Sequence, residues 1–194
     1  MTHRTLCRRQ HGFTLVEVMI AIAVLSIGIL TIIAAFASAV ASTQNSQENL
    51  ISRQKALEAM ESIFTARNTQ QISFAAINNI PSGGIFVSGA TPLWAAGPDG
   101  LVNTADDTPF AANGVCPAGP ECIPMPGPDG ILGTADDIPM SLGNFTRQIA
   151  ISPVVNADGT PNPNLRQITV TVSYAGSRGS ARTYTVNALI SSFR

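Results

Sequence analysis

The chain has 194 residues, which suits one domain with an attached segment better than two full domains. Its formal net charge is −1, so it lacks the strongly basic surface of most nucleic-acid-binding proteins, and we expect no nucleic-acid partner. Both histidines, His3 and His11, lie in the first twelve residues, and no histidine follows them. Because histidine is the commonest general acid–base group and a frequent zinc ligand, we do not expect an enzyme.

A long apolar segment follows a short basic run at the start of the chain. Arg4, Arg8 and Arg9 precede Gly12, and residues 13–41 contain a single charged side chain, Glu17. This segment exceeds the roughly 20 residues that a helix needs to cross a bilayer. The basic run is expected to stay in the cytoplasm, which would place the C-terminal part of the chain outside it.

Two ordinary explanations of the apolar segment can be compared with its length and charge. A cleaved signal peptide has an apolar core of roughly 7–15 residues, which is much shorter than this segment. A simple signal anchor has a suitable length but leaves Glu17 unexplained. A carboxylate inside an apolar helix costs about 3 kcal/mol unless it is paired or lies near an interface.

The start of the apolar segment reads Gly-Phe-Thr-Leu-Val-Glu at residues 12–17. This sequence resembles the processing site of type IV prepilins and pseudopilins, and the resemblance extends over residues 1–65. It implies that a prepilin peptidase cuts after Gly12 and methylates the new amino group of Phe13. It also implies that Glu17 meets the N-terminal ammonium of a neighbouring pilin subunit, and a buried carboxylate does require such a cation.

The helix is expected to continue in amphipathic form beyond the apolar segment. Leu50, Leu57, Met60 and Phe64 recur at helical spacing, and the first proline is Pro81. We therefore predict one helix over residues 13–67, about 80 Å long at 1.5 Å per residue. Its apolar stripe would pack on a C-terminal sheet.

The middle of the chain contains one acidic sequence twice. Residues 97–109 and 127–139 both begin Gly-Pro-Asp-Gly and both continue to Thr-Ala-Asp-Asp, and no Lys or Arg lies between residues 97 and 140. Pro-Asp-Gly favours a turn, which would bring three carboxylates together in each copy. They are Asp99, Asp106 and Asp107 in the first copy and Asp129, Asp136 and Asp137 in the second.

Clustered carboxylates favour a cation, and Ca²⁺ prefers hard oxygen ligands of this kind. The spacing also resembles calcium loops of the thrombospondin type 3 kind, although the alternating aspartates expected upstream are absent. Ca²⁺ is therefore the predicted cofactor, and two solvated acidic turns without a metal ion are the alternative.

Two cysteines, Cys116 and Cys122, lie between the acidic sequences, and the third, Cys7, precedes Gly12. An even pair in an exported chain predicts a disulfide. Zinc would require further Cys or His ligands, and the spacing excludes a redox site of the Cys-x-x-Cys type.

Three C-terminal segments alternate between apolar and polar residues, at residues 145–151, 168–174 and 184–190, although Arg147 interrupts the apolar face of the first. Turn sequences at residues 156–159 and 176–179 separate them, which predicts an antiparallel meander of about three strands. The predicted fold class is α+β, with a long helix packed on this sheet. The predicted parts are a cleaved leader (1–12), the helix (13–67), a loop-rich region with the acidic repeats and the disulfide (68–144), and the sheet (145–194).

These features together predict a minor pilin or pseudopilin of a type IV pilus or a type II secretion system. The runs at residues 17–21 and 25–28 resemble minor pilins of the pilus-modification type and I-type pseudopilins. Such a subunit would span the bacterial inner membrane once, with its C-terminal domain in the periplasm, before it joins a pilus or pseudopilus. The alternative is a calcium-dependent adhesive module held by a signal anchor, and a new N-terminus at Phe13 would distinguish the two.

Overall fold

The computed structural model describes residues 12–176 and 179–193. The chain divides into two compact units, Met1–Gln44 and Asn45–Arg194. Most of the predicted leader, with Cys7 and both histidines, lies outside the described residues, as do residues 177 and 178 of the second predicted turn.

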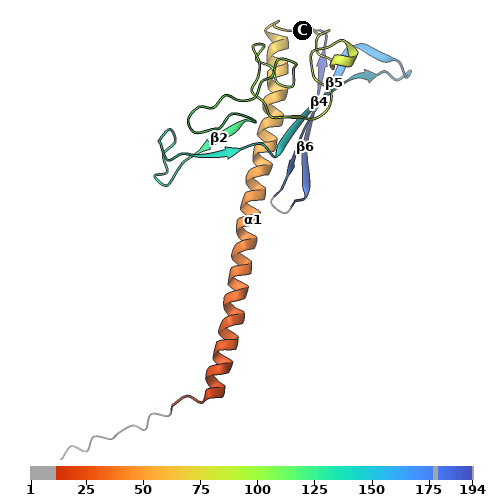
Figure 1. The fold of residues 1–194 in the computed structure, drawn as a ribbon. Coiled ribbons are helices and arrows are strands. Elements are labelled where there is room, and N and C mark those ends of the chain that lie inside the picture. The colour runs from red at the N-terminus through yellow and green to blue at the C-terminus, as the bar shows by residue number, and fades with distance from the viewer. Residues whose placement is uncertain (1–11, 177–178, 194) are drawn as a thin grey trace, which may run out of the picture. The chain divides into compact units, whose positions relative to one another are not determined.

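One helix, α1, runs over Leu15–Asn68 and contains residues 15–41 of the apolar segment (Figure 1). The prediction of a single helix over residues 13–67 is confirmed, with small differences at its ends. By length and composition this helix can cross a membrane. It is followed by Gln70, whose φ of 65° is a left-handed conformation that cannot continue an α-helix.

The part of α1 in the second unit buries one apolar stripe, half of it alanine. The buried apolar residues are Ile51, Ala56, Ala59, Met60, Ile63 and Ala66. The prediction that Leu50 and Leu57 belong to the packed stripe is wrong, because they are 64% and 44% exposed. The face that carries Ala56, Ala59 and Ala66 packs inward, and these leucines face outward.

The main sheet has four antiparallel strands in the order β1-β4-β5-β6. These are β1 (Thr91–Pro92), β4 (Phe145–Val155), β5 (Pro161–Ala175) and β6 (Ala181–Ser191). The predicted three-stranded meander is confirmed as β4, β5 and β6, and β1 adds a strand that was not predicted. A separate two-stranded sheet pairs β2 (Cys122–Met125) with β3 (Ile138–Ser141), and a short 3-10 helix, η1, covers Ile80–Ser82.

The core of the second unit lies between α1 and this sheet. Strands β4 and β5 supply inward-facing residues in register, so that Ile149 lies opposite Val170 and Ile151 opposite Ile168. The segments between α1 and β4 complete the core with Ile77, Phe86, Leu93, Leu101 and Leu142. The α+β prediction of a long helix packed on an antiparallel sheet is therefore confirmed.

Candidate functional site

The residues predicted to be processed and to guide docking lie together at the start of α1. Gly12 and Phe13 precede the helix, and Glu17 lies in its first turn. A shallow cavity of about 310 Å³ is lined by Phe13, Glu17, Val18, Ala21, Ile22 and Leu25. Large apolar side chains are exposed all round this part of the helix, a pattern suited to a lipid bilayer or a bundle of other helices. The carboxylate of Glu17 therefore lies at the N-terminal end of a helix surface that is otherwise apolar.

Thr14 fixes the position at which α1 begins. Its Oγ1 accepts a hydrogen bond from the backbone N–H of Glu17 at 3.2 Å, and its carbonyl accepts one from Val18 N at 3.2 Å. This is an N-cap, and threonine followed three residues later by glutamate is a known sequence signal of a helix start. This cap was not predicted from the sequence, although Thr14 and Glu17 carry its signal. The glutamate also lies where the helix dipole favours a negative charge.

The first acidic loop, residues 97–109, is held together by its own aspartates. Asp99 Oδ1 accepts from Leu101 N at 2.8 Å, Asp106 Oδ2 from Asp99 N at 3.3 Å, and Asp107 Oδ2 from Asn103 N at 2.7 Å. Thr104 Oγ1 donates to Asp106 Oδ1 at 2.7 Å, and this hydrogen bond lowers the pKa of Asp106. Burial raises the pKa of Asp107.

The second acidic loop, residues 127–139, repeats this bonding. Asp129 Oδ1 accepts from Ile131 N at 2.8 Å, Asp136 Oδ2 from Asp129 N at 3.2 Å, and Asp137 Oδ2 from Gly133 N at 2.7 Å. The Thr134 hydroxyl lowers the pKa of Asp136 in the same way.

The first glycine of each acidic loop lies against an aspartate near the end of the same loop: Gly97 against Asp106, and Gly127 against Asp136. A Cβ on Gly97 would lie 2.4 Å from the carboxyl carbon of Asp106, and one on Gly127 would lie 2.1 Å from the Asp136 carbonyl oxygen. No side chain fits at such distances, so the turn requires glycine at both positions. The repeated sequence therefore encodes a repeated local structure.

The calcium prediction concerns these same six carboxylates. Within the part of the chain that the structure describes, no group of three or more Asp, Glu, His or Cys side chains is arranged to hold a metal ion. Backbone N–H groups and threonine hydroxyls supply the positive partners that a cation would otherwise supply. One oxygen, Asp137 Oδ1, is buried without a hydrogen-bond partner among the described residues. Calcium binding stays a prediction.

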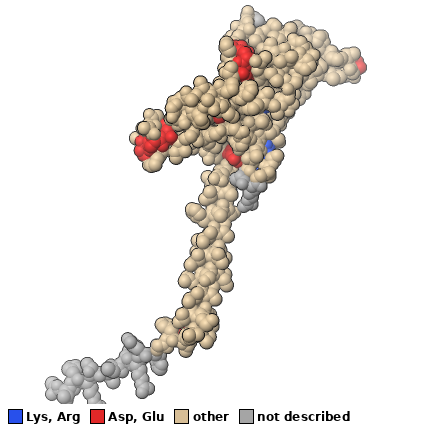
Figure 2. Space-filling view, viewed as in Figure 1, with Lys and Arg blue, Asp and Glu red and all other residues tan. Residues whose placement is uncertain are grey.

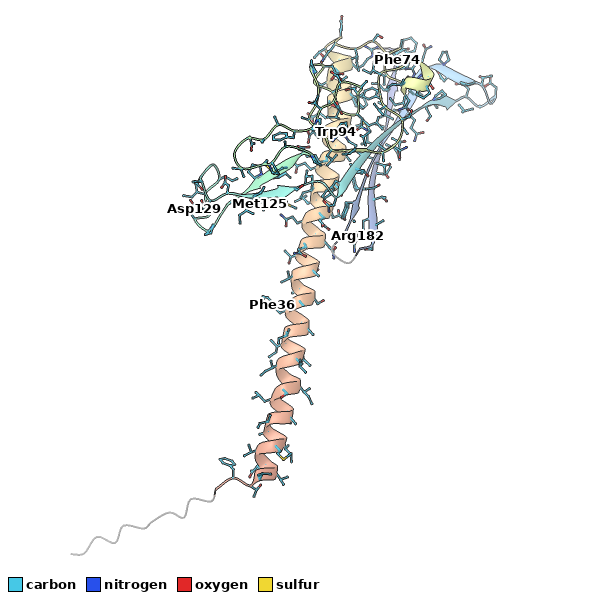
Figure 3. The ribbon with its side chains drawn as sticks, viewed as in Figure 1. Phe36, Phe74, Trp94, Met125, Asp129 and Arg182 are labelled. Atoms are coloured by element: carbon cyan, nitrogen blue, oxygen red, sulfur yellow. A yellow bond between two sulfur atoms is a disulfide. The ribbon has the colours of Figure 1, made fainter. Side chains whose placement is uncertain are left out.

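The two acidic loops share a backbone design but differ in their surroundings. In the first, Leu101 and Val102 are 1% and 8% exposed, whereas the corresponding Ile131 and Leu132 of the second are both 60% exposed. The second loop lies at the end of the arm formed by β2 and β3, where Asp129 is labelled in Figure 3. Acidic side chains gather at the same place in Figure 2. One loop is thus part of the core, and the other is presented to the surroundings.

A buried arginine secures the first loop. Arg147 of β4 is 1% exposed, and its Nε donates to Asn103 Oδ1 at 2.7 Å. Asn103 Nδ2 returns a hydrogen bond to the Arg147 carbonyl at 3.0 Å. Burial lowers the pKa of Arg147, and the charges of Glu58, Asp107 and Glu121 oppose that shift. In the second loop Gly133 stands where Asn103 stands in the first, so this attachment has no counterpart there.

The predicted disulfide joins Cys116 to Cys122, with Cα atoms 5.8 Å apart, and both cysteines are buried. Glu121 lies in the loop that the disulfide closes and forms an ion pair with Lys55 of α1. Lys55 Nζ also lies 2.8 Å from Glu58 Oε2. Burial lowers the pKa of Lys55, but the bonds to Glu121 and Glu58 outweigh it and the net shift is upward. The disulfide loop is therefore fastened to the helix.

Comparison with known proteins agrees with the geometry at the N-terminus. The family described as the prokaryotic N-terminal methylation motif matches residues 7–33. Neither the curated proteins nor the solved structures gave a match. The matched residues include the Gly12–Phe13 junction, Glu17 and the first turns of α1. The chain therefore carries the N-terminal motif of a type IV pilin-like prepilin, followed by one helix that is long and apolar enough to cross a membrane.

Proposed function

We propose that this chain is a minor pilin or pseudopilin, a filament subunit of a type IV pilus or a type II secretion system that is processed by a prepilin peptidase. The observation that carries the proposal is the matched methylation motif together with Glu17 in the first turn of an exposed apolar helix. The role is mechanical, and we propose no catalytic activity of its own. The basic run before Gly12 and the disulfide both support a single span with Asn45–Arg194 in the periplasm.

Cleavage after Gly12 would place a positive charge close to a negative one. The new N-terminal ammonium of Phe13 would stand just before the helix start at Leu15, and Glu17 would lie in the first turn. When subunits leave the lipid and pack as a helix bundle, a carboxylate among apolar neighbours costs about 3 kcal/mol unless a cation joins it. The ammonium of an adjacent subunit supplies that cation, so the pair favours one register between neighbouring helices.

Mass spectrometry of the mature protein tests this proposal directly. We expect an N-terminus at Phe13 that carries a methyl group, and a Cys116–Cys122 disulfide in the same molecule. A Gly12→Val variant should keep its leader, because a branched side chain replaces the glycine at the cut. An intact leader in the unaltered protein would instead support an adhesive module held by a signal anchor.

We also propose Ca²⁺ as a ligand of the second acidic loop, where Asp137 Oδ1 is a buried oxygen without a partner among the described residues. Calcium at about 100 times its dissociation constant would stabilise the folded chain by about 2.7 kcal/mol. Thermal melting of the detergent-solubilised protein should then shift upward by roughly 5–10 °C relative to a sample with chelator.

Two matched substitutions assign any calcium effect to a loop. Asp137→Asn should remove the shift, and Asp107→Asn at the equivalent position of the first loop should retain it. Identical melting curves of the unaltered protein with calcium and with chelator would count against the ion, and would favour turns held by hydrogen bonds alone.

A further inference from the structure

An exposed asparagine, Asn113, lies just before the disulfide in sequence and plays no part in the proposed role in a filament. The residue after it is Gly114, which is also exposed, and this is the one Asn-Gly pair in the sequence. Glycine has no Cβ, so its backbone nitrogen can be approached more closely than that of any other residue. The amide of Asn113 therefore stands beside a backbone nitrogen that no side chain shields.

The Asn113 side chain is folded back onto the backbone that follows it. Its Oδ1 accepts hydrogen bonds from Val115 N at 3.3 Å and from Cys116 N at 2.8 Å, and Asn113 N donates to the Cys116 carbonyl at 3.2 Å. A turn of this kind bends the side chain over the next peptide group, which brings Cγ of Asn113 toward Gly114 N. None of these three bonds uses the nitrogen of Gly114. Cys116 is 2% exposed and disulfide-bonded, so the turn has a fixed base.

We propose that Asn113 is a site of spontaneous modification, at which the side-chain amide is converted to a carboxylate. Gly114 N gives its proton to hydroxide and forms a bond to Cγ of Asn113. The negative charge that develops on Oδ1 faces the N–H groups of Val115 and Cys116, and donors placed in this way stabilise an oxyanion. The bond from Cγ to Nδ2 then breaks, and the nitrogen leaves as ammonia with a proton from water. A second water molecule opens the resulting cyclic imide at either of its carbonyl groups.

The two products of ring opening, aspartate and isoaspartate, affect the turn differently. Both add a negative charge to residues 97–140, which contain no basic residue. Aspartate keeps the oxygen that accepts from Cys116 N, so the turn is retained. Isoaspartate lengthens the backbone between Asn113 N and the Cys116 carbonyl, so their hydrogen bond is lost. The exposed surface beside the disulfide therefore changes as the protein ages, with or without cleavage after Gly12.

Two other asparagines provide controls within the same molecule. Asn162 forms a similar turn, because its Oδ1 accepts from Asn164 N at 2.9 Å, but the residue after it is Pro163, which has no N–H group and cannot attack. Asn103 is 1% exposed, and both ends of its amide are hydrogen-bonded to Arg147. We expect neither asparagine to react in the folded protein.

Incubation of the full-length protein in detergent and heavy-oxygen water tests the proposal. Samples are kept at neutral and at mildly alkaline pH, digested at low pH, and examined by peptide mass spectrometry. We expect a carboxylate that carries heavy oxygen at position 113, formed at a rate that rises with hydroxide concentration, and unaltered Asn162 and Asn103. Because the turn already holds the reacting groups together, the rate should lie within about tenfold of that in the unfolded, reduced chain, a barrier difference of at most about 1.4 kcal/mol.

Two substitutions at position 113 sharpen the test. Asn113→Gln moves the amide carbon away from Gly114 N and should leave the side chain unmodified. Asn113→Asp reproduces one product and should melt at the same temperature as the unaltered protein, since its carboxylate can accept the same two N–H groups. An Asn113 that stays intact in the folded protein would overturn the proposal, whether or not the unfolded chain reacts. Equal conversion of Asn113 and Asn162, or a rate independent of pH, would also overturn it.

Discussion

Replacing Glu17 by alanine is expected to reduce incorporation of the subunit into filaments by about a hundredfold and to leave its insertion into the membrane unchanged. The reason is the charge left behind: a neighbour's N-terminal ammonium, buried among apolar helices without its carboxylate, costs about 3 kcal/mol or more. Membrane insertion depends on the length and apolar character of α1, which the substitution does not alter. Immunoblots of sheared filaments and of washed membranes measure the two quantities.

Three further variants separate the charge of Glu17 from its place in the helix. Glu17→Gln keeps the size of the side chain but removes the charge, and should fail as Glu17→Ala does. Thr14→Ala removes the N-cap hydroxyl, which costs about 1 kcal/mol of helix stability, and should assemble far better than either. Ser26→Ala loses only a hydrogen bond to the Ile22 carbonyl and serves as the control. Normal filament content of the Glu17→Ala variant would contradict the docking role.

Replacing Arg147 by alanine should lower the free energy of unfolding of the second unit by about 3–5 kcal/mol. The substitution leaves Asn103 Oδ1 without its donor and opens a cavity beside a fully buried position. For a unit of this size the melting temperature should fall by about 10 °C or more, as measured by circular dichroism in detergent.

Arg182→Ala is the matched control, because Arg182 is an exposed arginine on β6 and its loss should change stability by no more than about 0.5 kcal/mol. Arg147→Lys should give an intermediate result, since lysine keeps the charge but not the planar group that reaches Asn103. If Arg147→Ala melts within about 1 °C of the unaltered protein, the arginine does not hold the first loop.

The elements that could be predicted from sequence are the long periodic ones. Helix α1 and strands β4 to β6 carry their pattern over many residues, so local exceptions such as Arg147 do not hide it. Strand β1 has only two residues and shows no alternation. Strands β2 and β3 contain Pro124 and Pro139, which argue against a strand, yet the two prolines lie opposite each other in an isolated pair. Both strands of a two-stranded sheet are edge strands, and edge strands can accept proline.

The N-terminal motif could be predicted because its residues are adjacent in sequence. The disulfide could be predicted because an even pair of cysteines in an exported chain has few alternatives. The packed face of α1 could not be predicted, because alanines and leucines both form apolar stripes on this helix. The sequence does not say which of the two stripes packs on the sheet. The different surroundings of the two acidic loops depend on the contact between Asn103 and Arg147, which are far apart in the chain.

The two copies of the acidic loop also divide two demands that usually fall on the same residues: one copy packs in the core, and the other forms exposed surface. Changes in the first copy disturb the core, so its apolar pair and Asn103 have little freedom to vary. The second copy keeps the same turn but projects its apolar pair from a two-stranded arm, where substitutions of Ile131 or Leu132 leave the core untouched. Duplication thus gives the chain one loop whose tip can diversify while its framework stays constant. Substitutions at that tip therefore change the exposed surface of the protein without disturbing its core.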